Sequence, residues 1–253
     1  MKNYEDPQWA EIYDLLHGED DVDVDFYLSE ARRAGGPVLD VACGTGRILL
    51  RLLERAIDVT GIDISQPMLD RLKEKARRSS LEARVTRADM RDFSLPERFR
   101  LIIVPFRSFM HLESKEDQLA ALTCFRKHLA PNGRLALNLF VPSADTLAAD
   151  GVGLRLSREL IDPDSGQRFK TWLSVSNDSK NQRQTIEWAF KGLVLGDDCA
   201  RARSLSLTLR WIYQSEFESL LKTAGYSHWK VFGGFHGEPL AGEGQEMVWI
   251  AIA

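Results

Sequence analysis

The sequence predicts an α/β fold: a mostly parallel sheet with helices on both faces, interrupted by an inserted antiparallel β-sheet. Between residues 37 and 140, short apolar segments alternate with segments of helical periodicity, which implies parallel strands joined by right-handed crossovers. The unbroken apolar run LIIV at residues 101–104 is typical of a strand covered on both faces. Between residues 168 and 212, apolar side chains recur at every second position, which is typical of antiparallel strands.

Two helices are expected before the first strand. Trp9, Tyr13 and Leu16 recur at helical spacing and predict a helix over residues 8–17. A second helix is expected over residues 26–34. It should stop at the Gly-Gly-Pro sequence that follows, because these residues interrupt helices.

Five strands and three helices then alternate up to residue 140. Ser65 is a natural N-cap for the second of these helices, which has a proline in its first turn and a basic C-terminal end at Arg78. The strands are expected at residues 37–42, 57–63, 82–89, 99–106 and 134–140, and the other two helices at residues 46–56 and 114–129.

The inserted sheet and the end of the main sheet follow. Polar turns separate alternating segments at residues 168–177, 183–195 and 203–212, within an insertion that spans residues 150–212. A helix over residues 214–224, a break at Gly225, and strands at residues 226–233 and 247–253 bring the main sheet to seven strands. We therefore expect a single domain over residues 1–253.

The composition limits the classes of partner. Lys and Arg total 33 and Asp and Glu total 37, so the net charge is −4, and no nucleic-acid partner is expected because nonspecific binding needs a basic surface. Cys43, Cys124 and Cys199 share no metal-ligand spacing, so no metal site is expected. No apolar run approaches the roughly 20 residues of a membrane helix, and the N-terminus lacks an apolar signal core. We therefore expect a cytoplasmic protein without membrane contact.

The sharpest functional signal is VLDVACGTGR at residues 38–47. An apolar strand runs into a glycine-containing loop that opens a helix, and ligands of open α/β sheets bind beyond the carboxyl ends of strands. Gly44 and Gly46 permit positive φ and let a ligand approach the backbone. The G-x-G-x-x-G dinucleotide fingerprint is not met, because its third glycine would fall at Leu49, and no Gly-Lys-Ser/Thr follows that would bind phosphate.

This segment resembles the first motif of class I S-adenosylmethionine-dependent methyltransferases, D-x-x-C-G-T-G, and the resemblance extends over residues 8–140. It implies a Rossmann-like sheet and S-adenosylmethionine as the cofactor, whose amino-acid part would face the loop. It also implies that Tyr13 closes over the cofactor, with plain helix packing as the alternative. The resemblance places Arg47 near the cofactor, and the alternative is that Arg47 is a solvated charge in the first turn of the helix. The loop residues carried over are Asp40, Ala42, Cys43, Gly44, Thr45, Gly46 and Arg47.

Three further segments correspond to the family's cofactor site. Asp63 ends the second strand, where the resemblance implies a carboxylate that accepts hydrogen bonds from the ribose hydroxyls. Asp89 follows the third strand and would accept from the exocyclic amine of adenine. The alternative for Asp63 is a helix-capping acid, and the alternative for Asp89 is a solvated acid in a turn. The other implied positions are Ile64 and Met90 beside the adenine, and Pro105 and Phe106 beneath the reacting methyl group. Met68 is a further candidate beside the adenine, with core packing as the alternative.

The end of the fourth strand indicates the class of acceptor. Residues 104–112, VPFRSFMHL, lack the N/D-P-P-Y/F element of enzymes that methylate base amines or glutamine. They are similar to the S-F-x-H-L form of small-molecule methyltransferases. The N-terminal A-x-x-Tyr-Asp element at residues 10–14 and the GTGR loop also resemble small-molecule methyltransferases, including sugar N-methyltransferases. The resemblance thus implies methyl transfer to N or O of a small-molecule acceptor, with His111 as a candidate general base. The candidate acceptor-site residues are Arg107, His111, Trp188, Trp211 and His236. The alternatives are solvent exposure for Arg107, a packed or hydrogen-bonded ring at a helix start for His111, and loop structure for His236.

The inserted sheet has two expected roles. It would roof the acceptor pocket or form the interface of a possible homodimer, with Trp172, Trp188 and Trp211 supplying apolar area for either, and internal sheet packing is the alternative for these rings. Two other function classes stay open, because a fold does not fix a function. They are an RNA or protein methyltransferase and a non-catalytic, S-adenosylmethionine-binding regulatory protein.

Overall fold

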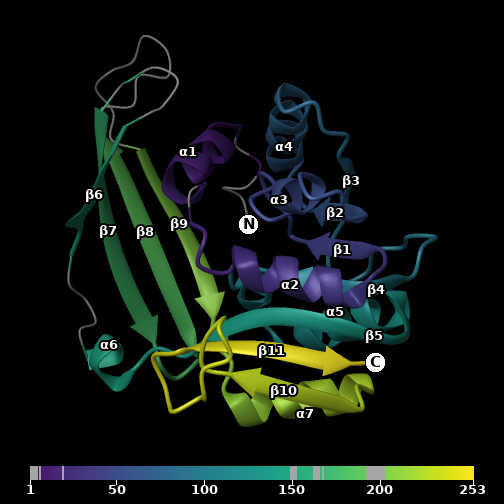
Figure 1. The fold of residues 1–253 in the computed structure, drawn as a ribbon. Coiled ribbons are helices and arrows are strands. Elements are labelled where there is room, and N and C mark those ends of the chain that lie inside the picture. Colours follow the sequence, from purple (N-terminus) through teal and green to yellow (C-terminus); the bar gives the residue numbers. More distant parts are fainter. Residues whose placement is uncertain are drawn as a thin grey trace.

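The larger of two β-sheets forms the centre of the protein (Figure 1). The computed structural model describes residues 5, 7–18, 20–148, 153–161, 166, 168–191 and 203–253. Seven strands lie in the order β10-β11-β5-β4-β1-β2-β3, and all pair in parallel except β11, which runs antiparallel to both β5 and β10. The predicted seven-stranded, mostly parallel sheet is confirmed. Its strands are β1 (Val38–Val41), β2 (Val59–Asp63), β3 (Arg84–Arg87), β4 (Phe99–Val104), β5 (Leu129–Phe140), β10 (His228–Phe232) and β11 (Glu246–Ile252).

Helices cover both faces of this sheet. Neighbouring residues of β1 point to opposite faces: Val38 packs in one apolar cluster with α2, α3 and α4, whereas Leu39 packs in another with α5 and α7. In the described part of the chain, no helix has the length and apolar content of a membrane span. The helices are α1 (Pro7–His17), α2 (Val24–Ala34), α3 (Leu49–Leu53), α4 (Gln66–Arg78), α5 (Lys115–His128), α6 (Ala144–Ala148), α7 (Gln214–Ala224) and the short 3-10 helix η2 (Ser108–His111).

A separate antiparallel sheet stands beside α1 (Figure 1). Its strands lie in the order β6 (Arg155–Ile161), β7 (Arg168–Asp178), β8 (Arg183–Lys191) and β9 (Arg203–Arg210). Strand β9 contacts η2, which follows the carboxyl end of β4, and the ring of Trp188 in β8 lies 6.1 Å from the ring of Trp9 in α1. The predicted inserted sheet is therefore confirmed, and it faces the carboxyl ends of the parallel strands.

Several element boundaries differ from the prediction. Strand β6 was not predicted, because six of its seven residues are exposed and its sequence RLSRELI has no apolar alternation. The predicted helix over residues 46–56 shortens to α3, because the chain is still turning at Gly46, where φ is +88°. The predicted strand at residues 183–195 ends with β8, and residues 192–195 lie outside the described residues.

Gly61 in β2 allows a close approach between this strand and the loop that follows β1. A Cβ atom at this position would lie 2.5 Å from Leu49 Cδ1 and 2.8 Å from Cys43 Sγ. Because overpacking a dense core is costly, Gly61→Ala is expected to lower the free energy of unfolding by about 1–3 kcal/mol. Urea denaturation measures the change. Gly242→Ala is the matched control, since nothing lies within 4 Å of its Cβ position, and equal stability of the two variants would contradict this packing argument.

Candidate active site

The loop after β1 turns sharply enough to present its backbone to a cavity. Ala42, Gly44 and Gly46 all have positive φ, at 56°, 54° and 88°. A Cβ atom at Gly46 would lie 2.8 Å from Leu72 Cγ, so this position requires glycine for its packing as well as for its backbone. A Cβ at Gly44 would have only Tyr13 Cε1 near it, at 4.0 Å, so the backbone there borders open space.

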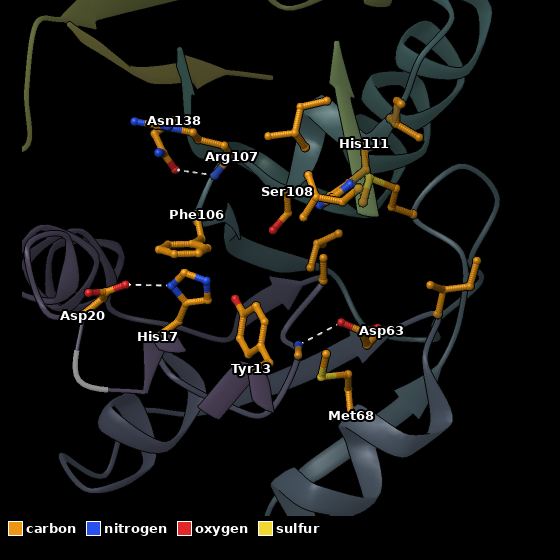
Figure 2. Close-up of a pocket in the computed structure, with 18 of the residues that line it drawn as sticks. Tyr13, His17, Asp20, Asp63, Met68, Phe106, Arg107, Ser108, His111 and Asn138 are labelled. Atoms are coloured by element: carbon orange, nitrogen blue, oxygen red, sulfur yellow. Dashed lines mark hydrogen bonds and ion pairs between the residues drawn. The ribbon is translucent and has the colours of Figure 1, made fainter. Parts of the chain in front are cut away.

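Asp63, the last residue of β2, holds the two neighbouring loops together. Its Oδ2 accepts a hydrogen bond from the Gly44 N–H at 2.8 Å (Figure 2). Its Oδ1 accepts one from the Ser65 N–H at 2.8 Å. Burial raises the pKa of the carboxyl group, and the backbone donors oppose that rise. Each carboxylate oxygen has a further lone pair, so Asp63 can still accept hydrogen bonds from a ligand in the cavity that it lines.

The other acid of the first motif, Asp40, is fully buried in β1. Its pKa is raised well above the ordinary value by burial, with Asp63 and Asp23 adding to the rise. Arg47 is also buried, and its alternative as a solvated charge is wrong. Its guanidinium forms a two-pronged ion pair with Asp23, whose Oδ2 accepts from Nη2 at 2.7 Å, and the two side chains are 7% and 2% exposed.

A cavity of about 660 Å³ lies between the two sheets. It is bordered by the loop after β1, the ends of β2 and β4, helix α1, and strands β8 and β9. Twelve of the residues singled out in the sequence line it: Tyr13, Ala42, Gly44, Asp63, Ile64, Met68, Asp89, Met90, Phe106, Arg107, His111 and Trp188. Eight others do not: Asp40, Cys43, Thr45, Gly46, Arg47, Pro105, Trp211 and His236.

Two residues expected at the acceptor site lie elsewhere. Trp211 is 1% exposed and packs in the apolar core. His236 is an exposed side chain that pairs with Glu238 at 3.4 Å, and its neighbour Phe235 lines the cavity instead. Neither difference could be seen in the sequence, because loop and strand ends place adjacent residues in different environments.

The segment after β4 is held in an unusual backbone conformation by a buried amide. Phe106 and Arg107 both have positive φ, at 57° and 61°. Asn138 Oδ1 accepts a hydrogen bond from the Arg107 N–H at 3.2 Å (Figure 2). The same oxygen accepts from the Tyr27 O–H at 3.2 Å, and Asn138 Nδ2 donates to Glu246 Oε2 at 3.0 Å. The Arg107 guanidinium is itself paired with Glu246, so it is not a free cation in the cavity.

His111 and Asp89 both line the cavity, and each already has partners. The His111 ring bonds to the backbone of Thr208, and burial lowers its pKa to about 4, so the ring is neutral but a weak proton acceptor at neutral pH. Asp89 accepts hydrogen bonds from Arg91 Nε at 3.0 Å and Nη2 at 2.6 Å, and this pairing lowers the pKa of Asp89.

The structure also places residues at the cavity that the sequence did not indicate. His17 is the main example: its ring lies 5.0 Å from the ring of Phe106 and 5.1 Å from that of Tyr13 (Figure 2). Its position four residues after Tyr13, on the same face of α1, was the available signal. For Asn138, the signal was a lone amide in the apolar strand sequence LALNLF. No cluster of three metal-ligating side chains is found in the described residues, and Cys199 lies outside them.

A parallel sheet of this order, with an open glycine loop after β1 and a buried carboxylate at the end of β2, defines an α/β protein that binds a nucleoside-containing cofactor. A family model described as a methyltransferase domain matches residues 38–133. The solved structure of DesVI from Streptomyces venezuelae superposes with a TM-score of 0.75 at 22% identity, covering 96% of this chain and 98% of that one, a likeness of fold.

Two relatives are similar in sequence. An alignment at 37% identity over 131 residues joins this chain to dTDP-3-amino-3,6-dideoxy-α-D-glucopyranose N,N-dimethyltransferase of Streptomyces fradiae, and it covers 49% of this chain and only 50% of that protein. A second, at 28% over 190 residues, joins it to dTDP-3-amino-3,4,6-trideoxy-α-D-glucopyranose N,N-dimethyltransferase of Streptomyces venezuelae and covers 69% of this chain and 78% of that protein. Residues 38–133 therefore match a methyltransferase domain, and both relatives in sequence are named as N,N-dimethyltransferases.

Proposed function

We propose that this enzyme transfers the methyl group of S-adenosylmethionine to an amine nitrogen of a small molecule, within the class of aminodeoxysugar nucleotides or similar amines. The observation that carries the proposal is the cavity of about 660 Å³, which joins the cofactor loops to the apolar face of the smaller sheet. Its size falls within the roughly 300–1,000 Å³ of small-molecule sites. Both relatives described above are named as N,N-dimethyltransferases of aminodeoxysugar nucleotides, which supports nitrogen as the acceptor atom.

The cofactor-binding role is proposed for the loop after β1 and for the two strand ends beside it. Gly44 leaves space beside its backbone, and Asp63 has acceptor sites directed at the same space. We assign Asp63 to the ribose hydroxyls and the segment around Asp89 to the adenine. Arg91 already takes both carboxylate oxygens of Asp89, so an adenine amine would share this acceptor.

The acceptor-binding role is proposed for the smaller sheet. Two of its adjacent strands contribute an apolar wall made of Ile186, Trp188, Leu207 and Leu209, and β6 adds the charged side chain of Arg158. A wall of this kind excludes water from the reacting groups. The homodimer interface stays a prediction, as does the absence of a nucleic-acid partner.

Methyl transfer requires the protein mainly to align the acceptor with the methyl group. The bound sulfonium supplies a methyl group that is already activated for transfer. The residues of this chain then have to orient the nucleophile in line, exclude water and keep the acceptor nitrogen unprotonated. Phe106 lies between the His17 ring, which meets it in a T-shaped contact, and the Arg47 guanidinium, and it fixes one wall of the space after β4.

Two measurements test the proposed function. Titration calorimetry with S-adenosylmethionine and with S-adenosylhomocysteine should show micromolar binding, and each ligand should raise the melting temperature. Formation of S-adenosylhomocysteine is then followed with a 3-amino-deoxyhexose nucleotide and with its analogue carrying a hydroxyl group in place of the amine. Turnover of the amine alone is expected. Turnover of the hydroxyl analogue alone would overturn nitrogen as the acceptor atom, and absence of cofactor binding would overturn the proposed site.

A further inference from the structure

Two histidines line the cavity from opposite sides, and their partners differ. His111 in η2 is bonded to a backbone group of Thr208 in β9. His17, at the end of α1, is instead bonded to a carboxylate: its Nδ1 lies 2.9 Å from Asp20 Oδ2. An ionised carboxylate can only accept, so Nδ1 carries the proton in this bond and Nε2 carries the lone pair.

Neighbouring side chains fix the position of the His17 ring and of its partner Asp20. Its ring is held between Phe106 and Tyr13, at 5.0 and 5.1 Å between centroids, and its side chain is 16% exposed. The carbonyl of Asp20 accepts a hydrogen bond from Arg47 Nη1 at 2.7 Å, which fixes the backbone of the partner. Among the described residues, no hydrogen bond engages Nε2. Figure 2 shows the ring with one nitrogen toward Asp20 and its opposite edge toward the space beside Tyr13.

We infer that His17, oriented by Asp20, is the general base that removes a proton from the ammonium form of the acceptor. This inference rests on the proposed function, because a sulfonium methyl group reacts with a free amine lone pair. An N–H bond of the ammonium breaks and its proton moves to Nε2. The nitrogen lone pair then forms the N–C bond as the C–S bond breaks, and the electron pair of that bond stays on sulfur.

The charges around His17 suit this step. Asp20 favours the protonated ring, whereas burial, Arg158 and Arg47 disfavour it, and the net effect lowers the pKa of His17 below its ordinary value. Tyr13 faces the ring as a neutral phenol, since burial raises its pKa. His17 is therefore unprotonated at neutral pH and has a carboxylate beside it that stabilises the imidazolium once it forms. The ring of His111 is instead bonded to the backbone of Thr208, and burial lowers its pKa to about 4.

A pH profile separates a base from a structural histidine. For His17→Gln, kcat/KM for the amine nucleotide at pH 7 is expected to fall about 100-fold or more. The loss should shrink about tenfold for each pH unit of rise, because the free amine becomes the major form without help, and it should vanish above the pKa of the amine. For Asp20→Asn, kcat/KM at pH 7 should also fall, but by less than for His17→Gln. His228→Gln is the matched control, since that ring is exposed in β10 and bonds only to Ser227.

Two further readouts do not depend on turnover. Calorimetry should give His17→Gln an affinity for S-adenosylmethionine within about twofold of the wild type. NMR of protein labelled with ¹⁵N-histidine should show the Nδ1-protonated tautomer for His17 at neutral pH, with that preference lost in Asp20→Asn. An Nε2-protonated tautomer, or a loss of activity in His17→Gln that is equal at pH 7 and pH 9, would overturn the role of His17 while leaving the proposed function intact. No turnover of any amine by the wild type would overturn both.

Discussion

Asp63→Ala is expected to weaken S-adenosylmethionine binding by at least about 100-fold. In the proposed complex, the two carboxylate oxygens accept from the ribose hydroxyls, and hydrogen bonds to a charged group contribute about 1.5–3 kcal/mol each. The substitution also leaves the Gly44 and Ser65 amides without their acceptor, since both donate to this carboxylate at 2.8 Å. The loop that borders the cofactor therefore loses its anchor as well as its polar contact. Titration calorimetry with each cofactor form measures the change.

Two comparisons isolate the cause of this loss. Asp70→Ala removes an exposed carboxylate from α4, seven residues further along the chain, and should leave the affinity unchanged. Asp63→Asn keeps the shape but has only one acceptor oxygen for two backbone donors, so it should lie between the wild type and Asp63→Ala. An affinity in Asp63→Ala equal to that of the wild type would remove Asp63 from the cofactor site.

Arg47→Met should destabilise the fold by about 3–5 kcal/mol, because it leaves the charge of Asp23 buried without a partner. Both side chains are nearly inaccessible, at 7% and 2% exposure. Asp23 is the N-cap residue of α2 but gives its carboxylate to Arg47 and makes no capping hydrogen bond, so the pair joins the first loop of the sheet to the start of α2. A fall in melting temperature of roughly 2–4 °C per kcal/mol is expected.

The double variant Arg47→Met/Asp23→Asn distinguishes a buried charge from lost packing. It removes both charges at once, so it should recover a large part of the stability lost in Arg47→Met. If the double variant were as unstable as the sum of the two single variants, the stacking of Arg47 on Phe106, at 4.8 Å, would account for the loss instead of the ion pair.

The cofactor half of the site could be predicted because its signals are local. The strand, glycine loop and helix around Gly44 are continuous in sequence, and Asp63 ends the next apolar strand, so each residue follows from the pattern in its own segment. Parallel pairing of β1 with β2 then brings the two ends together. Ala42, Gly44, Asp63 and Ile64 line one cavity for this reason.

The acceptor half of the site depends on contacts between residues far apart in the sequence, which no local pattern predicts. Asn138 and Glu246 are 108 residues apart in the chain and meet only because β11 inserts beside β5. His17 reaches Phe106 because α1 folds over the carboxyl end of β4. Trp211 was misplaced for the complementary reason, since a tryptophan that ends an alternating segment gives no indication of which apolar surface will bury it.

The construction of the cavity from two separate sheets has a consequence for how this protein could diversify. The loops proposed to hold the donor belong to the parallel sheet, whereas the apolar wall assigned to the acceptor comes from β8 and β9 of the other sheet. Substitutions at Ile186 or Leu207 can therefore reshape the space for a new acceptor without disturbing the anchor at Asp63. A laboratory library confined to these two positions would sample acceptor range while the residues proposed to hold the donor stay unchanged, and a lineage under natural selection has the same freedom.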